Sequence, residues 1–349
     1  MTRGPAQVRP VLRAGRWREE LPGSPWRWAL APLLVPAWAA YTGVVRWRNR
    51  GFDRQQHGPL KLPVPVVSVG NLTAGGTGKT PAVLTVCAAL RRRGWHPAVL
   101  SRGYRAAADG SNDEARLMGD VPVVCDRDRY AGGLRAIAGG ADCLVLDDGA
   151  QHRRLHRDVE ILLIDATRPG HWCLPMGWLR EPWSGLGRAD LLWISRAGLV
   201  DADELAALRQ RLASTAVVIA DVHRRGEVVS LDGVARLTPA EVQGKRVLLA
   251  SGLGNPRSFE LAAERQGMAI VASWRYPDHH HFSASDVADL VQACDRQGAE
   301  LLVTAKDAVK LRALKPTVPV WVLGVSDALD DAGLAGLDHC LDRAFPKRA

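Results

Sequence analysis

The stretch that decides the fold is "VPVVSVGNLTAGGTGKTPAV", residues 64–83. An apolar, β-branched run ends in glycines, and a Lys-Thr pair then opens an apolar-periodic segment, which predicts a strand, a loop and a helix. The phosphate-loop template G-x-x-x-x-G-K-[ST] fits residues 73–80, except that Thr73 replaces its first glycine. The three remaining glycines still allow main-chain N–H groups to surround a phosphate.

We therefore expect this loop to hold a nucleotide, with Lys79 at the β- and γ-phosphates and Thr80 at Mg²⁺. The expected phosphate-binding residues are Thr73, Ala74, Gly75, Gly76, Thr77, Gly78, Lys79 and Thr80. The alternative is a glycine-rich turn of a Rossmann-like sheet without a nucleotide. Such a turn would not require the Lys-Thr pair at its end.

A nucleotide loop needs an acid for magnesium at the end of a neighbouring strand. The run "CLVLDDG", residues 143–149, places Asp147 and Asp148 directly after four apolar residues, as in a Walker-B strand. We expect these carboxylates at the metal. Asp165, at the end of "ILLID", is the alternative acid; otherwise it caps a helix or shapes a turn.

Strand-like runs alternate with helical patterns from Val64 to about Asp165, which predicts a mostly parallel sheet flanked by helices, an α/β fold of the P-loop NTPase type. A second, smaller α/β set begins at "KRVLLASGLGNP", residues 245–256. Between the two sets, "STAVVIADVHRRGEVVSLDG" predicts a β-hairpin linker. The expected divisions are an N-terminal basic, Trp-rich segment, a P-loop core, the hairpin and a C-terminal lobe, at residues 1–50, 51–215, 216–240 and 241–349.

The composition is that of an ordinary folded protein, with 47% hydrophobic and 24% charged residues among 349. The net charge of +9 indicates an anionic partner: nucleic acid, a phosphorylated small molecule or an anionic membrane. The six cysteines are scattered and form no C-x-x-C pair, which favours a reducing, cytosolic setting over a disulfide framework or a zinc site.

The first fifty residues carry much of the positive charge, because they hold nine arginines against two glutamates, together with five of the twelve tryptophans. Their apolar stretch, within "WRWALAPLLVPAWAAYTGVVRWRNR" at residues 26–50, is interrupted by Pro32 and Pro36. Tryptophan prefers the headgroup level and arginine attracts anionic lipid, so a helix lying in the membrane interface is expected. A transmembrane span and a buried N-terminal helix are the alternatives.

Further motifs follow in order: "LSRGY" (100–104), "DDGAQHRRLHRDVEILLID" (147–165), "LPMGWLREP" (174–182), "YPDHHHF" (276–282) and "TAKDAVK" (304–310). Together with the phosphate loop they closely resemble the tetraacyldisaccharide 4'-kinases, the lipid A kinases of Gram-negative bacteria, from about Trp26 to about Lys310. The resemblance implies a membrane-associated P-loop enzyme with two α/β lobes. It also implies transfer of the γ-phosphate of ATP to the 4'-hydroxyl of a tetraacyl glucosamine disaccharide 1-phosphate, which forms lipid IVA.

The resemblance also assigns residues. It places ATP at the loop and Mg²⁺ at Thr80, Asp147 and Asp148, with Glu181 of "LREP" as a further acid near the metal. Gln151 and His152 match polar residues close to the substrate, and Arg102 of "SRGY" is a further candidate for the sugar phosphate.

Asp113 and His279 match the family's Asp-His pair, which activates the acceptor hydroxyl. The chemistry is reasonable, since a carboxylate within hydrogen-bond reach accepts the hydroxyl proton while a histidine orients or relays for it. The alternatives are a solvated loop acid at Asp113 and a zinc site at residues 279–281. Adjacent side chains point in different directions, which disfavours the zinc site.

Departures from the family pattern include Ala150, where a bulky apolar residue is usual, Ala305, which replaces an acid, and Ala115, which replaces a proline after Asp113. The competing function is a membrane-associated P-loop GTPase or ATPase switch; "TAKD" is a near miss to the guanine-reading [NT]-K-x-D element. We expect ATP and Mg²⁺ as cofactors, an acylated disaccharide lipid as substrate, and no nucleic acid or obligate protein partner. The expected location is the cytoplasmic face of the bacterial inner membrane, with a peripheral or monotopic attachment.

Overall fold

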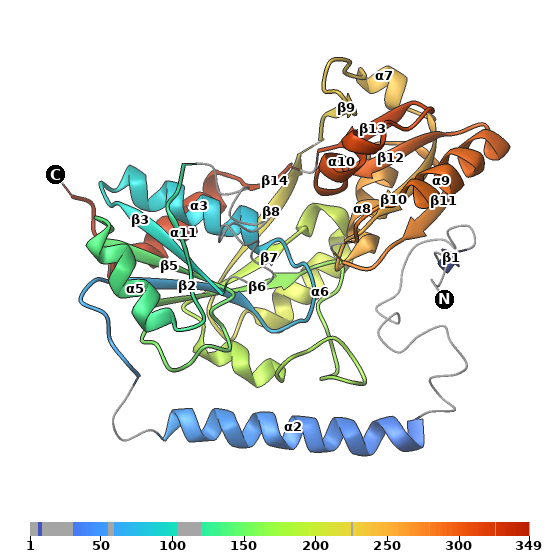
Figure 1. Cartoon of the computed structure of the whole chain (residues 1–349). Coiled ribbons are helices and arrows are strands. Elements are labelled where there is room, and N and C mark those ends of the chain that lie inside the picture. The colour runs from blue at the N-terminus through green and yellow to red at the C-terminus, as the bar shows by residue number, and fades with distance from the viewer. Residues whose placement is uncertain are drawn as a thin grey trace. The chain divides into compact units, whose positions relative to one another are not determined.

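The computed structural model describes residues 6–8, 31–54, 59–102, 120–224, 226–278, 280–324 and 326–348 (Figure 1). The chain divides into two compact units. The larger unit comprises Trp17–Asp221 and Leu329–Ala349, and the smaller one comprises Met1–Arg16 and Val222–Ala328.

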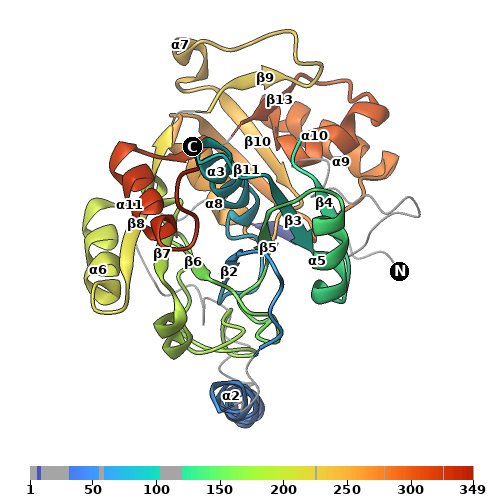
Figure 2. The ribbon, with the colours of Figure 1, turned by 90° about the vertical axis from the view of Figure 1, so that its left-hand side faces the viewer.

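An eight-stranded sheet lies mostly in the larger unit and has the strand order β14-β8-β7-β6-β2-β5-β3-β4, most of which is visible in Figure 2; the end of β8 and most of β14 fall within the range of the smaller unit. Every strand pair from β8 to β4 is parallel, which confirms the expected sheet type. The strands are β2 (Val66–Asn71), β3 (Pro97–Ser101), β4 (Val123–Cys125), β5 (Cys143–Asp147), β6 (Val159–Asp165), β7 (Leu191–Ser195), β8 (Val217–Arg224) and β14 (Ser326–Leu329).

Helices cover both faces of this sheet. Successive side chains of a strand point to opposite faces, and here the side chains on each face are apolar and pack against helices. Ile161 and Leu163 of β6 pack in one core cluster with helices α3 (Lys79–Arg92) and α11 (Asp331–Asp342). The alternate residues, Leu162 and Ile164, pack in a second cluster with α6 (Ala202–Leu212). A third cluster joins β3 and β5 to α5 (Arg129–Ala138). The short 3₁₀ helices of this unit are η1 (Trp183–Arg188) and η2 (Ala197–Leu199).

The smaller unit is built on a six-stranded sheet with the order β1-β11-β10-β12-β13-β9. The four central strands are parallel, and the edge strands β1 and β9 pair antiparallel. The strands are β1 (Ala6–Val8), β9 (Val228–Ser230), β10 (Arg246–Ser251), β11 (Ala269–Arg275), β12 (Glu300–Thr304) and β13 (Val320–Leu323). The helices are α7 (Pro239–Val242), α8 (Pro256–Arg265), α9 (Ala284–Gln297), α10 (Ala305–Leu311) and η3 (Arg312–Leu314).

The expected β-hairpin between the two β-rich runs of residues 216–240 is wrong, and the antiparallel bridge described in this range joins Val229 to Arg236 instead. Strand β8 pairs in parallel with β7 in the eight-stranded sheet, whereas β9 pairs with β13 in the six-stranded sheet. The two β-rich runs are neighbours in sequence, but each finds its partner strand in a different unit.

The two ends of the chain also divide differently from the expected ranges. Helix α11 belongs with the phosphate-loop unit, because Leu337, Leu341 and Phe345 are buried in the same cluster as α3. At the other end, β1 pairs with β11 of the smaller unit, so the first fifty residues contribute to both units.

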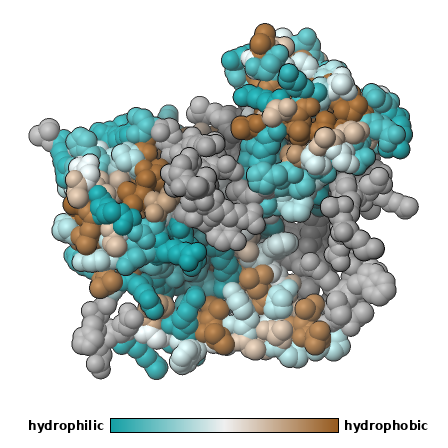
Figure 3. All heavy atoms as spheres, viewed as in Figure 1, coloured by the Kyte–Doolittle hydropathy of each residue, from teal (hydrophilic) through white to brown (hydrophobic). Residues whose placement is uncertain are grey.

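A long N-terminal helix, α2 (Ala31–Asp53), belongs to the larger unit and includes Pro36. Its inner face packs Trp38 and Tyr41 against the α6-side core, and Trp38 meets Trp172 edge to face with ring centroids 5.2 Å apart. Leu33 and Trp47 are 73% and 76% exposed. Figure 3 shows apolar and polar residues alternating along α2 at the lower edge of the view. Within the described ranges no helix, α2 included, is long and apolar enough to cross a membrane.

Candidate active site

The phosphate loop connects β2 to α3 and is held by side chains around it. Asn71 Nδ2 donates to Thr73 O at 2.8 Å and to Thr73 Oγ1 at 3.0 Å, and Ser195 Oγ donates to Thr77 O at 2.8 Å. Gly75 and Gly78 have φ angles of 98° and 80°, in the left-handed region that favours glycine. Gly78 is the N-cap of α3, so the positive end of this 14-residue helix faces the loop.

Lys79 Nζ lies between two oxygens, 3.1 Å from Asn71 Oδ1 and 3.2 Å from Asp148 Oδ1. Asp148 follows β5 with a φ of 51°, in the left-handed region that residues other than glycine rarely adopt. Burial acts to raise the pKa of Asp148, but the adjacent Lys79 and Arg180 lower it to about 2. The carboxylate is therefore ionised at neutral pH, and its side chain is 37% exposed.

The other expected metal residues differ in their surroundings. Thr80 is half-buried in the first turn of α3. Asp147 is buried at the end of β5, level with Val69 of β2, and its carbonyl oxygen accepts from Arg129 Nη2 at 2.9 Å.

Asp165, the alternative acid, is fully buried, and it holds a turn together. It accepts from Thr167 N and Thr167 Oγ1 at 3.0 and 2.6 Å. It also pairs with Arg196, whose Nη1 donates to Gly76 O at 2.9 Å. Asp165 therefore supports the phosphate loop through Arg196.

Glu181 is 1% exposed and is surrounded by hydrogen-bond donors. Its Oε1 accepts from Gln151 Nε2 and Arg188 Nη2, each at 3.0 Å, and its Oε2 accepts from Asn49 Nδ2 at 2.8 Å. Burial acts to raise the pKa of Glu181, but Arg188 and the hydrogen bonds hold it below its usual value.

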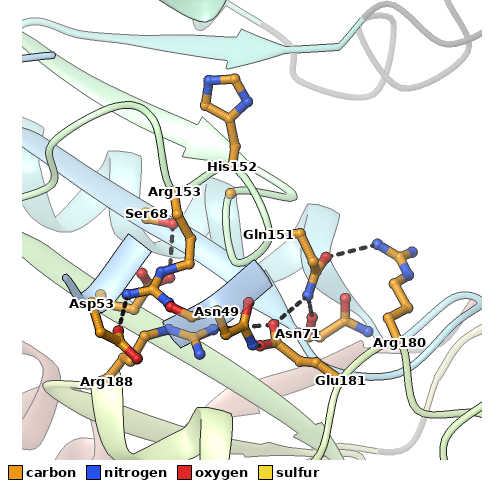
Figure 4. Close-up of polar contacts among 12 residues, drawn as sticks. Asn49, Asp53, Ser68, Asn71, Gln151, His152, Arg153, Arg180, Glu181 and Arg188 are labelled. Carbon is orange, nitrogen blue, oxygen red and sulfur yellow. Dashed lines mark hydrogen bonds and ion pairs between the residues drawn. The ribbon is translucent and has the colours of Figure 1, made fainter. Parts of the chain in front are cut away.

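Gln151 and His152 are neighbours that point in different directions (Figure 4). Gln151 Nε2 also donates to Asn71 O at 2.9 Å, and Gln151 Oε1 accepts from Arg180 Nη1 at 3.2 Å. His152 points away from this group, and burial together with Arg129, Arg157, Arg102 and Arg154 lowers its pKa to about 4. Arg102 is exposed just after β3.

Asp113 and His279 lie outside the described residues, so their expected pairing stays a prediction. Among the described residues of the smaller unit, His280 Nε2 contacts Asp286 Oδ2 at 3.1 Å, and its ring stacks on Tyr276 with centroids 4.6 Å apart. The described part of the chain contains no group of three or more His, Cys, Asp or Glu side chains that could hold a metal.

Two of the departures from the family pattern, Ala150 and Ala305, lie among the described residues, whereas Ala115 lies outside them. Ala150 is fully buried against Gly70, where an added Cβ would lie 2.5 Å from Ala150 N. Ala305 is exposed at the first position of α10.

Asn71, Arg180 and Asn49 were not among the site residues predicted from the sequence. Asn71 ends β2 immediately before the loop, and Arg180 precedes Glu181 in "LREP", so both stood within motifs that were already singled out. Asn49 carries no comparable sequence signal, since it lies among arginines near the end of α2, 132 residues before its partner.

Comparisons with known proteins identify the family of this chain. The family model of tetraacyldisaccharide-1-P 4'-kinase matches residues 30–342. A tetraacyldisaccharide 4'-kinase of Anaeromyxobacter sp. (strain K) is 39% identical over 330 residues, covering 86% of each chain. One from Syntrophus aciditrophicus is 36% identical, covering 84% of this chain and 88% of the relative. The crystal structure of LpxK from Aquifex aeolicus in complex with ATP matches with a TM-score of 0.64 and 26% identity, covering 90% of this chain and 99% of that one.

Proposed function

Because the chain belongs to the tetraacyldisaccharide-1-phosphate 4'-kinase family, we propose that its residues 73–80 hold the phosphates of ATP and that Lys79 and Asp148 form the centre of phosphoryl transfer. The chain is an ATP-dependent kinase of lipid A biosynthesis. This family membership replaces the alternative hypothesis of a GTPase or ATPase switch. The contact that carries the assignment of the centre is the 3.2 Å pair of Lys79 Nζ and Asp148 Oδ1 at the mouth of the loop.

Several features of the loop support ATP binding. Gly75 and Gly78 adopt conformations that turn backbone N–H groups inward, and α3 adds the positive end of its dipole. Thr77 Oγ1 is buried and has no hydrogen-bond partner among the described residues, so it is a donor that a phosphate oxygen would satisfy. Lys79 supplies the charge for the β- and γ-phosphates.

The donor set also suits Mg²⁺, which prefers oxygen ligands and needs few of them from the protein. We assign the metal to the Thr80 hydroxyl and the ionised, half-buried carboxylate of Asp148. When bound, Mg²⁺ neutralises charge on the transferring phosphoryl group. Asp147 and Glu181 are assigned to the same region as supporting acids. Both Glu181 oxygens already accept hydrogen bonds, so its main role is to hold Gln151 and Arg188.

The acceptor side of the reaction is assigned from the family resemblance alone. We assign Asp113 as the base that accepts the proton of the 4'-hydroxyl and His279 as the group that orients it. Arg102, Gln151 and His152 are assigned to the sugar and phosphate of the lipid. Positioning and charge neutralisation supply most of the rate in such reactions, so Lys79 and the metal site outweigh the base.

An acylated disaccharide stays in a bilayer, and we therefore place the enzyme at the cytoplasmic face of the inner membrane. The outer face of α2 supports this assignment, because Leu33, Val44 and Trp47 are 73%, 62% and 76% exposed. Trp47 and Phe52, with Arg48, Arg50 and Arg54, line a hollow at the end of this helix. Aromatic and basic side chains of this kind suit an anionic headgroup region.

The direct test is to incubate the protein with ATP labelled at the γ-phosphate and the tetraacyl disaccharide 1-phosphate, and to locate the label. We expect label at the 4'-position. Lys79→Ala and Asp148→Asn should each lower turnover by about 10²-fold or more. Label at another position, or turnover in both variants equal to that of the wild type, would contradict the proposal.

The base is tested separately with Asp113→Ala. The expected result is a large loss of kcat with nearly unchanged affinity for ATP, because a base acts on the acceptor and does not contact the nucleotide. Equal losses in the two quantities would mean that Asp113 is not the base.

A further inference from the structure

Helix α2 has an inner face that reaches into the candidate active site. Trp38, Tyr41, Thr42, Val45 and Asn49 recur at helical spacing on this face. Thr42 and Val45 are 5% and 6% exposed, so the helix is packed against the larger unit along much of its length. The outer face carries the exposed apolar side chains assigned above to the membrane.

Two polar contacts join the inner face to consecutive residues of the site. Tyr41 Oη donates to the carbonyl oxygen of Arg180 at 2.9 Å, and Asn49 Nδ2 donates to Glu181 Oε2 at 2.8 Å. Arg153 also holds the end of α2 that carries Asn49. Its Nη1 donates to Asn49 O at 3.0 Å, and its guanidinium pairs with Asp53 (Figure 4).

Gln151 connects Glu181 to the phosphate loop. Its side chain makes hydrogen bonds to Glu181 Oε1, to Asn71 O and to Arg180. Asn71 accepts from Lys79, and Arg180 pairs with Asp148. Figure 4 shows Gln151 between Arg180 and Glu181. An unbroken series of side-chain contacts therefore leads from α2 to both charged groups of the phosphoryl-transfer centre.

The orientation of Asn49 is fixed by charge. Its amide N–H faces the Glu181 carboxylate, and the opposite rotamer would place a carbonyl oxygen against that negative group. Of the hydrogen bonds described above, the one from Asn49 is the one that Glu181 Oε2 accepts. Without it this oxygen would be left without a described donor, although Glu181 is only 1% exposed. A buried carboxylate oxygen without a donor carries its full desolvation cost, which favours a rearrangement of the groups around it.

We propose that Asn49 is a positioning residue that couples the seating of α2 on a lipid surface to the arrangement of Glu181, Gln151 and Arg180. A lipid surface then raises turnover by ordering the catalytic centre, in addition to presenting the substrate. This inference rests on the proposed function, because it takes Lys79, Asp148 and α2 in the roles assigned there. A shift of about 1 Å in such a centre changes rates by about 10²-fold, so a single hydrogen bond suffices for a measurable effect.

The experiment compares the wild-type chain with Asn49→Leu, which keeps the approximate size and removes the donor, and Tyr41→Phe, which removes only the hydroxyl. Trp47→Ser changes the outer face of the same helix and serves as the comparison variant that should lose vesicle binding. The membrane is a vesicle of phosphatidylethanolamine and phosphatidylglycerol without acceptor lipid. Sedimentation measures vesicle binding, and hydrogen exchange of residues 176–188 measures the order of the Arg180 and Glu181 segment.

We expect vesicles to slow exchange of this segment in the wild type and to leave it unchanged in Asn49→Leu, although both bind vesicles equally. Trp47→Ser should lose vesicle binding. In assays with acceptor lipid in mixed micelles, Asn49→Leu should lower kcat by about tenfold or more with KM values within about twofold. Tyr41→Phe should show a smaller change of the same kind.

The inference is overturned if Asn49→Leu keeps both the vesicle-induced protection and the kcat of the wild type. If Asn49→Leu does not fold, as judged by circular dichroism, Tyr41→Phe decides by the same two measurements. Hydrogen exchange with acceptor-free vesicles does not depend on phosphoryl transfer. A failure of the kinase assignment would therefore appear as absent product in the wild type and would be distinct from absent coupling.

Discussion

Arg180 shares the carboxylate of Asp148 with Lys79: Arg180 Nη1 lies 2.9 Å from Asp148 Oδ2, and Lys79 Nζ lies 3.2 Å from Asp148 Oδ1. Two cations therefore neutralise the acid that we assign to Mg²⁺. A metal ion held by this carboxylate would compete with both cations, and a displaced cation would then be available to phosphate oxygens. In this proposal Arg180 would link metal binding to the charge presented to the nucleotide.

Arg180→Gln removes one competitor for Asp148. The concentration of Mg²⁺ needed for half-maximal activity should fall by up to about fivefold, because a partly exposed ion pair is worth at most about 1 kcal/mol. The kcat should fall by about tenfold or more, since a charge near the transferring phosphate is lost. A magnesium titration at saturating ATP measures both.

Arg180→Lys is the matched control, since it keeps the charge and should retain more of the activity. An unchanged or higher magnesium requirement in Arg180→Gln would refute competition at Asp148.

Gly70→Ala tests the close approach of β2 to the segment after β5. An added Cβ would lie 2.5 Å from Ala150 N and 2.6 Å from Ala150 Cβ, so the backbone must shift. Overpacking of this kind costs about 1–3 kcal/mol, and we expect a lower unfolding midpoint in urea. Gly187→Ala is the control, because an added Cβ there meets no atom within 4 Å. Equal midpoints for the two variants would show that the approach is not tight.

His152 should make stability depend on pH. Burial and the neighbouring arginines lower its pKa from 6.5 to about 4, so between these values the unfolded chain binds a proton that the folded chain does not. Its contribution to stability is complete above pH 6.5 and is lost as the pH falls toward 4. His152→Gln removes this contribution.

The melting temperatures of both proteins at pH 7.5 and 5.0 provide the measurement. We expect a smaller decrease for His152→Gln than for the wild type. His281→Gln, at an exposed position, serves as the control. Equal decreases in His152→Gln and the wild type would show that His152 does not stay neutral in the folded protein.

Arg93→Met should loosen α11 from the larger unit. Arg93 is 2% exposed and donates to Asp342 Oδ1 at 2.9 Å, to Phe345 O at 3.0 Å and to Asp338 O at 2.6 Å. Loss of hydrogen bonds from a charged group costs about 1–3 kcal/mol, so hydrogen exchange of residues 331–342 should become faster.

Arg91→Met, two residues earlier in the chain, breaks an exposed pair with Asp120 and should leave this exchange rate within the range of the wild type. Unchanged protection of α11 in Arg93→Met would mean that apolar packing alone holds the helix.

Much of the larger unit follows from local sequence. The β-branched run before the glycines, the Lys-Thr pair and the two aspartates after "CLVL" correctly predicted β2, α3 and β5, because side-chain period and turn residues act over a few positions. Parallel strands with their carboxyl ends at one edge then bring Asp148 to Lys79 without further information.

The sequence by itself thus determined the phosphate loop, the parallel sheet and the order of the motifs. Only the tertiary structure decided that β8 and β9 separate into two sheets, that α11 returns to the phosphate-loop unit, and that Asn49 and Arg180 reach Glu181 and Asp148. The physical reason is distance along the chain: Asn49 and Glu181 are 132 residues apart, and Arg93 and Asp338 are 245 apart. Such contacts depend on which faces meet when the cores form, and no local period encodes that choice.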